Sequence, residues 1–285
     1  MTTLAWRDQE LHHLIETAAD QLTAAWRTLT GAQQAVLTVV DSTGDTRRRS
    51  ATLRAALAQF NAAVAGFDAA AVSITARWAS TDLPRAYRHG AEAALHTARM
   101  PAWAPRPAFE WTAQHQHAAA ALSAGAYAAL LRRVLDTVRR ARSFHRAVAE
   151  TLRARGPADT SRLTAGHRLD AVVYADATRY PAAAWARAAL TAQAVTAANT
   201  AAVHATAGDL NADWVQVVDG RDCGWTSHPD PEPADGTLRS VDSAAAHPIA
   251  HPGCTRGFIP RPDLTGRTDI EDGQQAEEED QSTWH

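Results

Sequence analysis

Residues 214–262 have the sequence WVQVVDGRDCGWTSHPDPEPADGTLRSVDSAAAHPIAHPGCTRGFIPRP, and this stretch decides the architecture of the C-terminal part of the chain. Residues 214–218 are rich in β-branched side chains and predict a short strand, and the Asp219-Gly220 pair that follows is a turn signal. Residues 229–236 contain three prolines, which fix φ and remove backbone donors, so this segment is a loop. The stretch therefore predicts a small, irregular unit with short strands.

A unit of this kind buries little apolar surface and needs a local staple. The stretch contains both cysteines of the chain, and four of its residues form two closely spaced pairs: Cys223 with His228, and His251 with Cys254. Two thiolates and two imidazoles form a common tetrahedral zinc site, in which a longer loop joins two short-spaced pairs. These four residues are the predicted Zn²⁺ ligands, and His247 competes for a ligand role.

Two alternatives to the metal stay open. The cysteines can be buried apolar residues, with the histidines in ordinary hydrogen bonds. A Cys223–Cys254 disulfide is the other alternative, and a reducing cytosol disfavours it.

The rest of the chain is rich in alanine and predicts helices. Hydrophobic residues make up 46% of the 285 residues but aromatic residues only 6%, a composition that favours closely packed helices. Apolar residues recur at helical spacing and predict helices over 4–41, 46–80, 84–99, 109–155, 161–180 and 181–206. Besides 214–218, strand signals are confined to 237–241 and 256–259.

The acidic charge is concentrated at the C-terminus. Residues 263–285 contain eight acidic side chains against the single basic residue Arg267, although the whole chain has a net charge of only −3. So polar a segment predicts disorder. We therefore expect a mainly α protein in four regions: a helical partner-binding region at 1–157, further helices at 158–208, the small α+β, turn-rich unit at 209–262 and a disordered acidic tail at 263–285.

The strongest basic stripe lies in the predicted helix at 127–155. The apolar residues of this segment share one helical face, and the arginines fall on the opposite face. The candidate contacts to DNA phosphates or to an acidic partner surface are Arg132, Arg139, Arg142 and Arg146. The simpler interpretation is a solvated face, because all 28 basic residues of this lysine-free chain are arginine.

Several classes of function have no support in the sequence. The chain lacks a phosphate-binding glycine-rich loop, His-Glu-x-x-His, Gly-x-Ser-x-Gly and the zinc deaminase signature, so we expect no enzymatic activity. The N-terminus shows no secretory signal, and no unbroken run of about 18 apolar residues predicts a membrane span. A soluble protein, cytoplasmic when it is made, is the expectation.

The order of motifs in the C-terminal stretch resembles the C-terminal signature of the MuF-type phage minor head proteins. The shared features are a strand ending at Asp219, then Cys223, a Gly/Pro-rich loop and a closing His-Pro-x-Cys that spans 251–254. The preceding helix is similar to a family helix that ends near an asparagine, here Asn199. The resemblance covers about residues 180–262.

The chain departs from the family pattern at two positions. Thr226 and Arg256 stand where the pattern has the second cysteine of each cysteine pair. If cysteine-rich relatives bind a metal, His228 has to substitute as a ligand in this chain.

The resemblance implies a minor head protein that associates with the portal and with capsid or scaffold proteins during procapsid assembly in the host cytoplasm. It also implies retention in the virion head. The N-terminal helices would dock on the portal through their apolar faces before residue 100. Two rival functions are a DNA-binding packaging or injected accessory protein, and a zinc-dependent hydrolase or toxin module. The hydrolase is disfavoured because four protein ligands leave a zinc ion no open position for catalysis.

Overall fold

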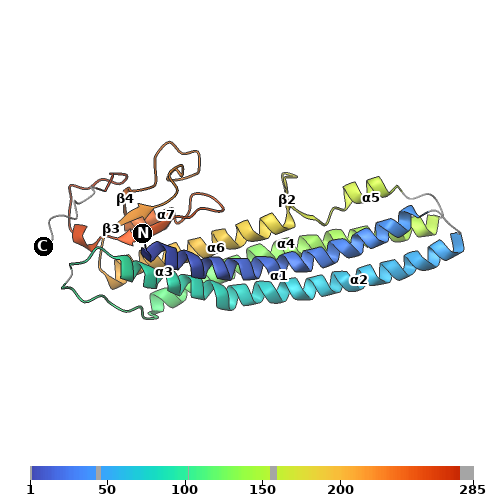
Figure 1. Ribbon diagram of the computed structural model, residues 1–285, viewed down its shortest axis with the longest axis horizontal. Coiled ribbons are helices and arrows are strands. Elements are labelled where there is room, and N and C mark those ends of the chain that lie inside the picture. The colour runs from blue at the N-terminus through green and yellow to red at the C-terminus, as the bar shows by residue number, and fades with distance from the viewer. Residues whose placement is uncertain (1, 43–45, 102, 155–158, 277–285) are drawn as a thin grey trace. The chain divides into compact units, whose positions relative to one another are not determined.

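The computed structural model of the protein describes residues 2–42, 46–101, 103–154 and 159–276. Most of these residues are helical, and the small sheets lie in the C-terminal half, so the predicted mainly α fold class is confirmed (Figure 1). The chain forms two compact units, one built from segments 1–15, 80–124 and 188–285 and the other from 16–79 and 125–187. These units cut across the four consecutive regions expected from the sequence, because the long helices contribute residues to both units.

The long helices lie close to their predicted positions. Their bounds are α1 Thr2–Asp41, α2 Thr46–Arg77, α3 Leu83–Thr97, α4 Ala113–Ala154 and α6 Ala182–His204. Two five-residue π-helical segments interrupt the α-helical geometry, η1 (Trp78–Asp82) before α3 and η2 (Ala205–Asp209) after α6. The helical predictions succeed because the apolar spacing is regular over many turns.

The core of the second unit, 16–79 with 125–187, uses a few large rings among many alanines. Trp26 packs edge-on against Phe67, with ring centroids 4.8 Å apart, and against Trp185 at 5.7 Å. Phe60 and Phe144 form a similar edge-on pair at 5.1 Å. Edge-to-face pairs of this kind add to the area-based stabilisation.

The helix predicted at 161–180 is wrong. A short helix α5 (Thr160–Gly166) is followed by a two-stranded antiparallel hairpin, β1 (Ala171–Val173) and β2 (Arg179–Pro181). Side chains of α4 hold this hairpin: Arg140 donates to the carbonyls of Arg168 and Ala171, and Arg133 stacks 4.1 Å from the ring of Tyr174. These tertiary hydrogen bonds override the local helical pattern.

A three-stranded sheet forms the framework of the small turn-rich region at 209–262. β3 (Trp214–Val218) lies between β4 (Leu238–Ser240) and β5 (Gly257–Pro260), and both pairings are antiparallel. A short helix α7 (Val241–Ala246) follows β4, and a 3₁₀ turn η3 (Pro262–Leu264) follows β5. Val215 and Val217 are fully buried, as the period of two predicts for a strand with one face toward the core.

The acidic segment is ordered as far as the structure describes it. Leu264 and Ile270 are buried in a cluster with Leu238, and the backbone of Leu238 bonds to Gln274 and Gly273. The disorder predicted from residue 263 onward is therefore wrong for 263–276, because two apolar residues anchor a polar stretch on β4. The remaining residues of the tail, 277–285, lie outside the described part of the chain.

Two helical stretches have the length and composition of a membrane span. Windows of 18 residues within 48–97 and 113–153 reach mean hydropathies of 1.3 and 1.2. They reach these values through alanine rather than through an unbroken run of larger apolar residues. Core helices satisfy the same criterion, so these windows alone do not indicate a membrane protein.

The close approach of α3 and α6 depends on one glycine. A Cβ atom added at Gly90 would lie 2.1 Å from the carbonyl oxygen of Ala198, a backbone atom that cannot move aside cheaply. Small residues at such a crossing let the two backbones pack tightly.

Gly90→Ala should therefore destabilise the protein by about 3 kcal/mol or more, at or above the upper end of overpacking costs, in a urea unfolding experiment. Gly125→Ala is the matched control, because a Cβ at this helical position meets no atom within 4 Å. That change should raise stability by about 0.5–1 kcal/mol through helix propensity. Equal effects of the two substitutions would contradict the packing of α3 on α6.

Candidate metal centre

The pairing of two strands brings the cysteines together. β3 and β5 are antiparallel neighbours, and Val218 pairs with Gly257 at the last position of their register. Cys223 lies in the loop that leaves this end of β3, and Cys254 lies in the loop that enters β5 from the same end. Residues more than thirty positions apart in sequence therefore meet at one edge of the sheet.

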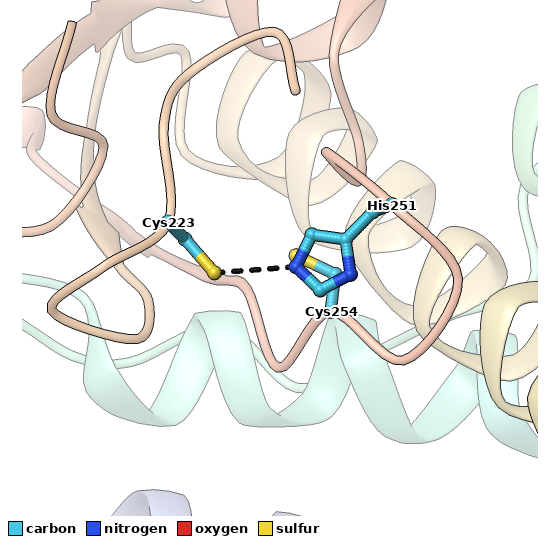
Figure 2. A group of neighbouring side chains, drawn as sticks. All are labelled: Cys223, His251 and Cys254. Atoms are coloured by element: carbon cyan, nitrogen blue, oxygen red, sulfur yellow. Dashed lines mark hydrogen bonds between the residues drawn. The ribbon is translucent and has the colours of Figure 1, made fainter. Parts of the chain in front are cut away.

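Three potential ligands form a compact group. The ligand atoms of Cys223, His251 and Cys254 all lie within 4.8 Å of one another, and Cys223 Sγ lies 3.3 Å from His251 Nε2 (Figure 2). Sulfur and nitrogen ligands of a tetrahedral zinc site lie about 3.6 Å apart, given bonds of about 2.3 and 2.1 Å. The group has the donor types and spacing to hold a metal ion.

His228, the fourth predicted ligand, lies at the edge of this group. Its Nδ1 is 3.9 Å from Cys223 Sγ, and its ring is 4.9 Å from the ring of His251. His247, which competed for a ligand role, is engaged elsewhere: its Nδ1 lies 3.2 Å from the carbonyl of Ser243 and its ring packs against Trp225. Both cysteines are free thiols in the structure.

A buried ion pair holds the two ligand-bearing loops together. The side chains of Asp219 and Arg256 are fully buried, and Arg256 Nε donates to Asp219 Oδ2 at 2.9 Å. The rest of the guanidinium donates to backbone carbonyls: Nη1 to Trp225 and His247, and Nη2 to Gly224. One side chain therefore links the loop of Cys223 to the segment that carries His251 and Cys254.

The Asp219 carboxylate of this ion pair also acts on the cysteine thiols. Cys254 Sγ donates to both carboxylate oxygens of Asp219 at 3.6 Å. Burial raises the pKa of the Cys223 thiol, and the charges of Asp219 and Cys254 raise it further. Without a cation the site disfavours the Cys223 thiolate, whereas a bound divalent cation would stabilise it.

A side chain of α6 holds the segment that carries His251 and Cys254. Asn199 is fully buried, and its Nδ2 donates to the carbonyls of Pro248 at 2.7 Å and Arg256 at 2.9 Å. The sequence indicated Asn199 only through the family resemblance, and it gave no sign that this amide contacts the loop 49 to 57 positions away.

Trp225 is a further residue that sequence reasoning missed. It is 3% exposed, and the guanidinium groups of Arg239 and Arg256 lie 4.2 Å and 4.5 Å from its ring. The available signal was a tryptophan in a glycine- and proline-rich loop of an arginine-containing unit, because cation–π contacts with indole rings are common.

The arginine stripe on α4 is exposed. All four predicted contact residues are solvent-exposed, opposite the buried Leu130, Val134 and Val138: Arg132, Arg139, Arg142 and Arg146. Arg139 is paired with Asp136 on the same helix. The neighbouring arginines that hold the β1–β2 hairpin do not belong to this surface.

Comparison of the chain with protein-family models, with curated proteins and with solved structures yields no match in any of the three.

Arg256→Ala should destabilise the protein by about 3–5 kcal/mol, because it leaves the Asp219 carboxylate buried without its partner. Chemical denaturation followed by tryptophan fluorescence measures this loss. Arg267→Ala is the control, since its pair with Asp269 is more than half exposed on both sides and solvent screens its charges. A loss below about 1 kcal/mol for Arg256→Ala would rule out the ion pair as the staple of the two loops.

Proposed function

We propose that the protein is a phage minor head protein of the MuF type, without enzymatic activity. In this role it associates with the portal and with capsid or scaffold proteins during procapsid assembly in the host cytoplasm, and it stays in the virion head. The supporting observation is the meeting of the residues that carry the family resemblance. Cys223, His251 and Cys254 form one group, and Asp219 and Asn199 hold the loops on which the group is carried.

Zinc is the metal that this proposal assigns to the group. Thiolate and imidazole ligands suit Zn²⁺, whereas Mg²⁺ and Ca²⁺ prefer oxygen ligands. His228 completes a four-ligand set by a small movement of an exposed side chain, since its Nδ1 already lies 3.9 Å from Cys223 Sγ. A closed set of four protein ligands serves structure rather than catalysis.

The apolar helix faces are buried within the protein, so we place the proposed portal contact elsewhere. Leu11, Leu14, Leu22 and Trp26, which the sequence offered for docking, are at most 5% exposed in the protein's own core. Among the side chains that the structure describes in 9–42, 48–101 and 103–153, the large apolar side chain with the greatest exposure is Trp103, at 86%. Exposed tryptophans are frequent anchors of protein interfaces, so Trp103 is the proposed portal anchor.

Purified protein should contain about one zinc per chain by elemental analysis. Cys254→Ser should remove the metal and broaden the NMR signals of residues 214–260 while the helical circular dichroism persists. His228→Ala separates the ligand sets: loss of stoichiometric zinc supports four ligands, and retention supports three. Folded wild-type protein that never takes up zinc would leave the hydrogen-bonded turn unit as the alternative.

Trp103→Ala should weaken binding to the portal protein of the same phage by at least about 2 kcal/mol, or roughly thirtyfold, in a titration with purified full-length proteins. Tyr180→Ala is the control, because Tyr180 is an exposed aromatic residue on the β1–β2 hairpin at 48% exposure. Unchanged affinity for Trp103→Ala would assign the portal contact elsewhere, and absence of the protein from purified virions would refute the proposed role.

DNA binding is the second candidate function, because the arginine stripe is exposed. Reversal of Arg132, Arg139 and Arg146 to glutamate tests it in the same experiments. Loss of salt-dependent duplex binding with portal affinity intact would support the DNA-binding packaging function. Unchanged behaviour in both assays would leave the stripe as a solvated face.

A further inference from the structure

A chain of four polar side chains lies among the helices of the unit formed by 1–15, 80–124 and 188–285. Tyr87 Oη lies 2.9 Å from Nδ1 of His115 and 2.9 Å from Nδ1 of His204. His115 Nε2 lies 3.2 Å from Asp209 Oδ2, so the order is Asp209, His115, Tyr87, His204. Tyr87 is fully buried and His115 is 2% exposed, whereas the residue His204 is partly exposed.

The sequence does not indicate this group, because its members come from separate elements. Tyr87 lies on α3, His115 on α4 and His204 near the end of α6, and the π-helical turn η2 ends at Asp209. The wider π-helical turn sets the position of Asp209 relative to α6, and π-helical turns are frequent at functional sites. The loop between α3 and α4 covers the chain of side chains: Trp111 stacks on Tyr87 with ring centroids 5.8 Å apart.

The donors and acceptors of a neutral chain have one consistent order. The Asp209 carboxylate can only accept, so His115 Nε2 carries a hydrogen and His115 Nδ1 is a bare acceptor. Tyr87 then donates its hydroxyl hydrogen to His115, and its oxygen accepts from the Nδ1–H of His204. The reverse order would set the Nε2 lone pair of His115 against the carboxylate. His204 therefore presents an unprotonated Nε2, to which none of the described residues donates a hydrogen bond.

Addition of one proton reverses the order without breaking the chain. The proton binds Nε2 of His204, the Nδ1 hydrogen of His204 passes to Tyr87 Oη, and the former hydroxyl hydrogen of Tyr87 passes to His115 Nδ1. His204 is then neutral with its hydrogen on Nε2. The positive charge rests on His115, beside the Asp209 carboxylate, where an opposite charge stabilises it.

We propose that Asp209, His115, Tyr87 and His204 form a two-state proton relay, in which His204 Nε2 exchanges a proton with a water molecule or a ligand hydroxyl. This acid–base site is separate from the metal centre and independent of the proposed head function. Tyr87, His115 and Asp209 are positioning residues, because only His204 meets the proton donor.

The electrostatic environment agrees with this assignment. Burial lowers the pKa of His204, and the charge of His115 lowers it further, so His204 is neutral at pH 7. Burial raises the pKa of Tyr87, and the Asp209 charge adds to this, so Tyr87 passes protons without ionising. The charges that act on these two groups are those of His115 and Asp209, and the covering loop adds the apolar rings of Phe109 and Trp111.

Long-range ¹H–¹⁵N NMR of full-length protein with ¹⁵N-labelled histidine tests the relay. At pH 8, His204 should be the Nδ1–H tautomer and His115 the Nε2–H tautomer. As the pH falls, His204 should switch to the Nε2–H tautomer while His115 becomes doubly protonated. The exposed His117 of α4 is the internal control, because it is not a member of the relay.

Tyr87→Phe removes the bridging hydroxyl, so His204 should then take up the proton on its own ring, without a change of tautomer. If this variant fails to fold, Asp209→Asn serves instead. It should weaken proton binding by the relay at least tenfold, because the charge beside His115 is lost. A wild-type His204 that carries its hydrogen on Nε2 at pH 8, or that holds the positive charge itself at low pH, would overturn the proposal.

Discussion

The buried ion pair between Asp219 and Arg256 is the constraint on which the C-terminal unit depends. A charge without a partner in this interior would cost several kcal/mol, so each of the two residues requires the other. Arg256 also donates hydrogen bonds to backbone carbonyls of the two ligand-bearing segments, which lie outside the three short strands. The ion pair therefore determines how closely Cys223 approaches Cys254, and with it the geometry of the candidate metal centre.

Alanine-rich helices place unusual demands on the few polar residues buried between them. Close packing of small side chains brings backbones together, as at Gly90 and Ala198, and leaves little room for water. Asn199 and Tyr87 meet this demand with side-chain hydrogen bonds, to loop carbonyls and to histidine nitrogens respectively. These contacts put the ligand-bearing loop and the proposed relay in defined positions, because a buried polar group without partners would be costly.

Elements set by a local sequence pattern were predictable, and elements set by contacts between residues far apart in sequence were not. The helices of 4–41 and 109–155 were predictable because one apolar stripe repeats over many turns, and the strand at 214–218 because its valines alternate. The hairpin at 171–181 was not predictable, because Arg140 of α4 holds its first strand and the residue Arg168 before it through hydrogen bonds across 31 and 28 positions of sequence. Charge suggested a disordered segment after residue 263, and the burial of Leu264 and Ile270 overrode it for the part that the structure describes.

The sequence by itself determined the helical class, the turn-rich unit and the residue types of a candidate metal centre, because periodicity, proline content and the scarcity of cysteine are local properties. Only the tertiary structure decided that Cys223, His251 and Cys254 share one site with His228 at its edge, since the register of β3 and β5 brings their loops to the same end of the sheet. Only the tertiary structure brought His115 to Asp209 and Tyr87 to His204, because the crossing of helices joins residues whose spacing in the sequence carries no signal.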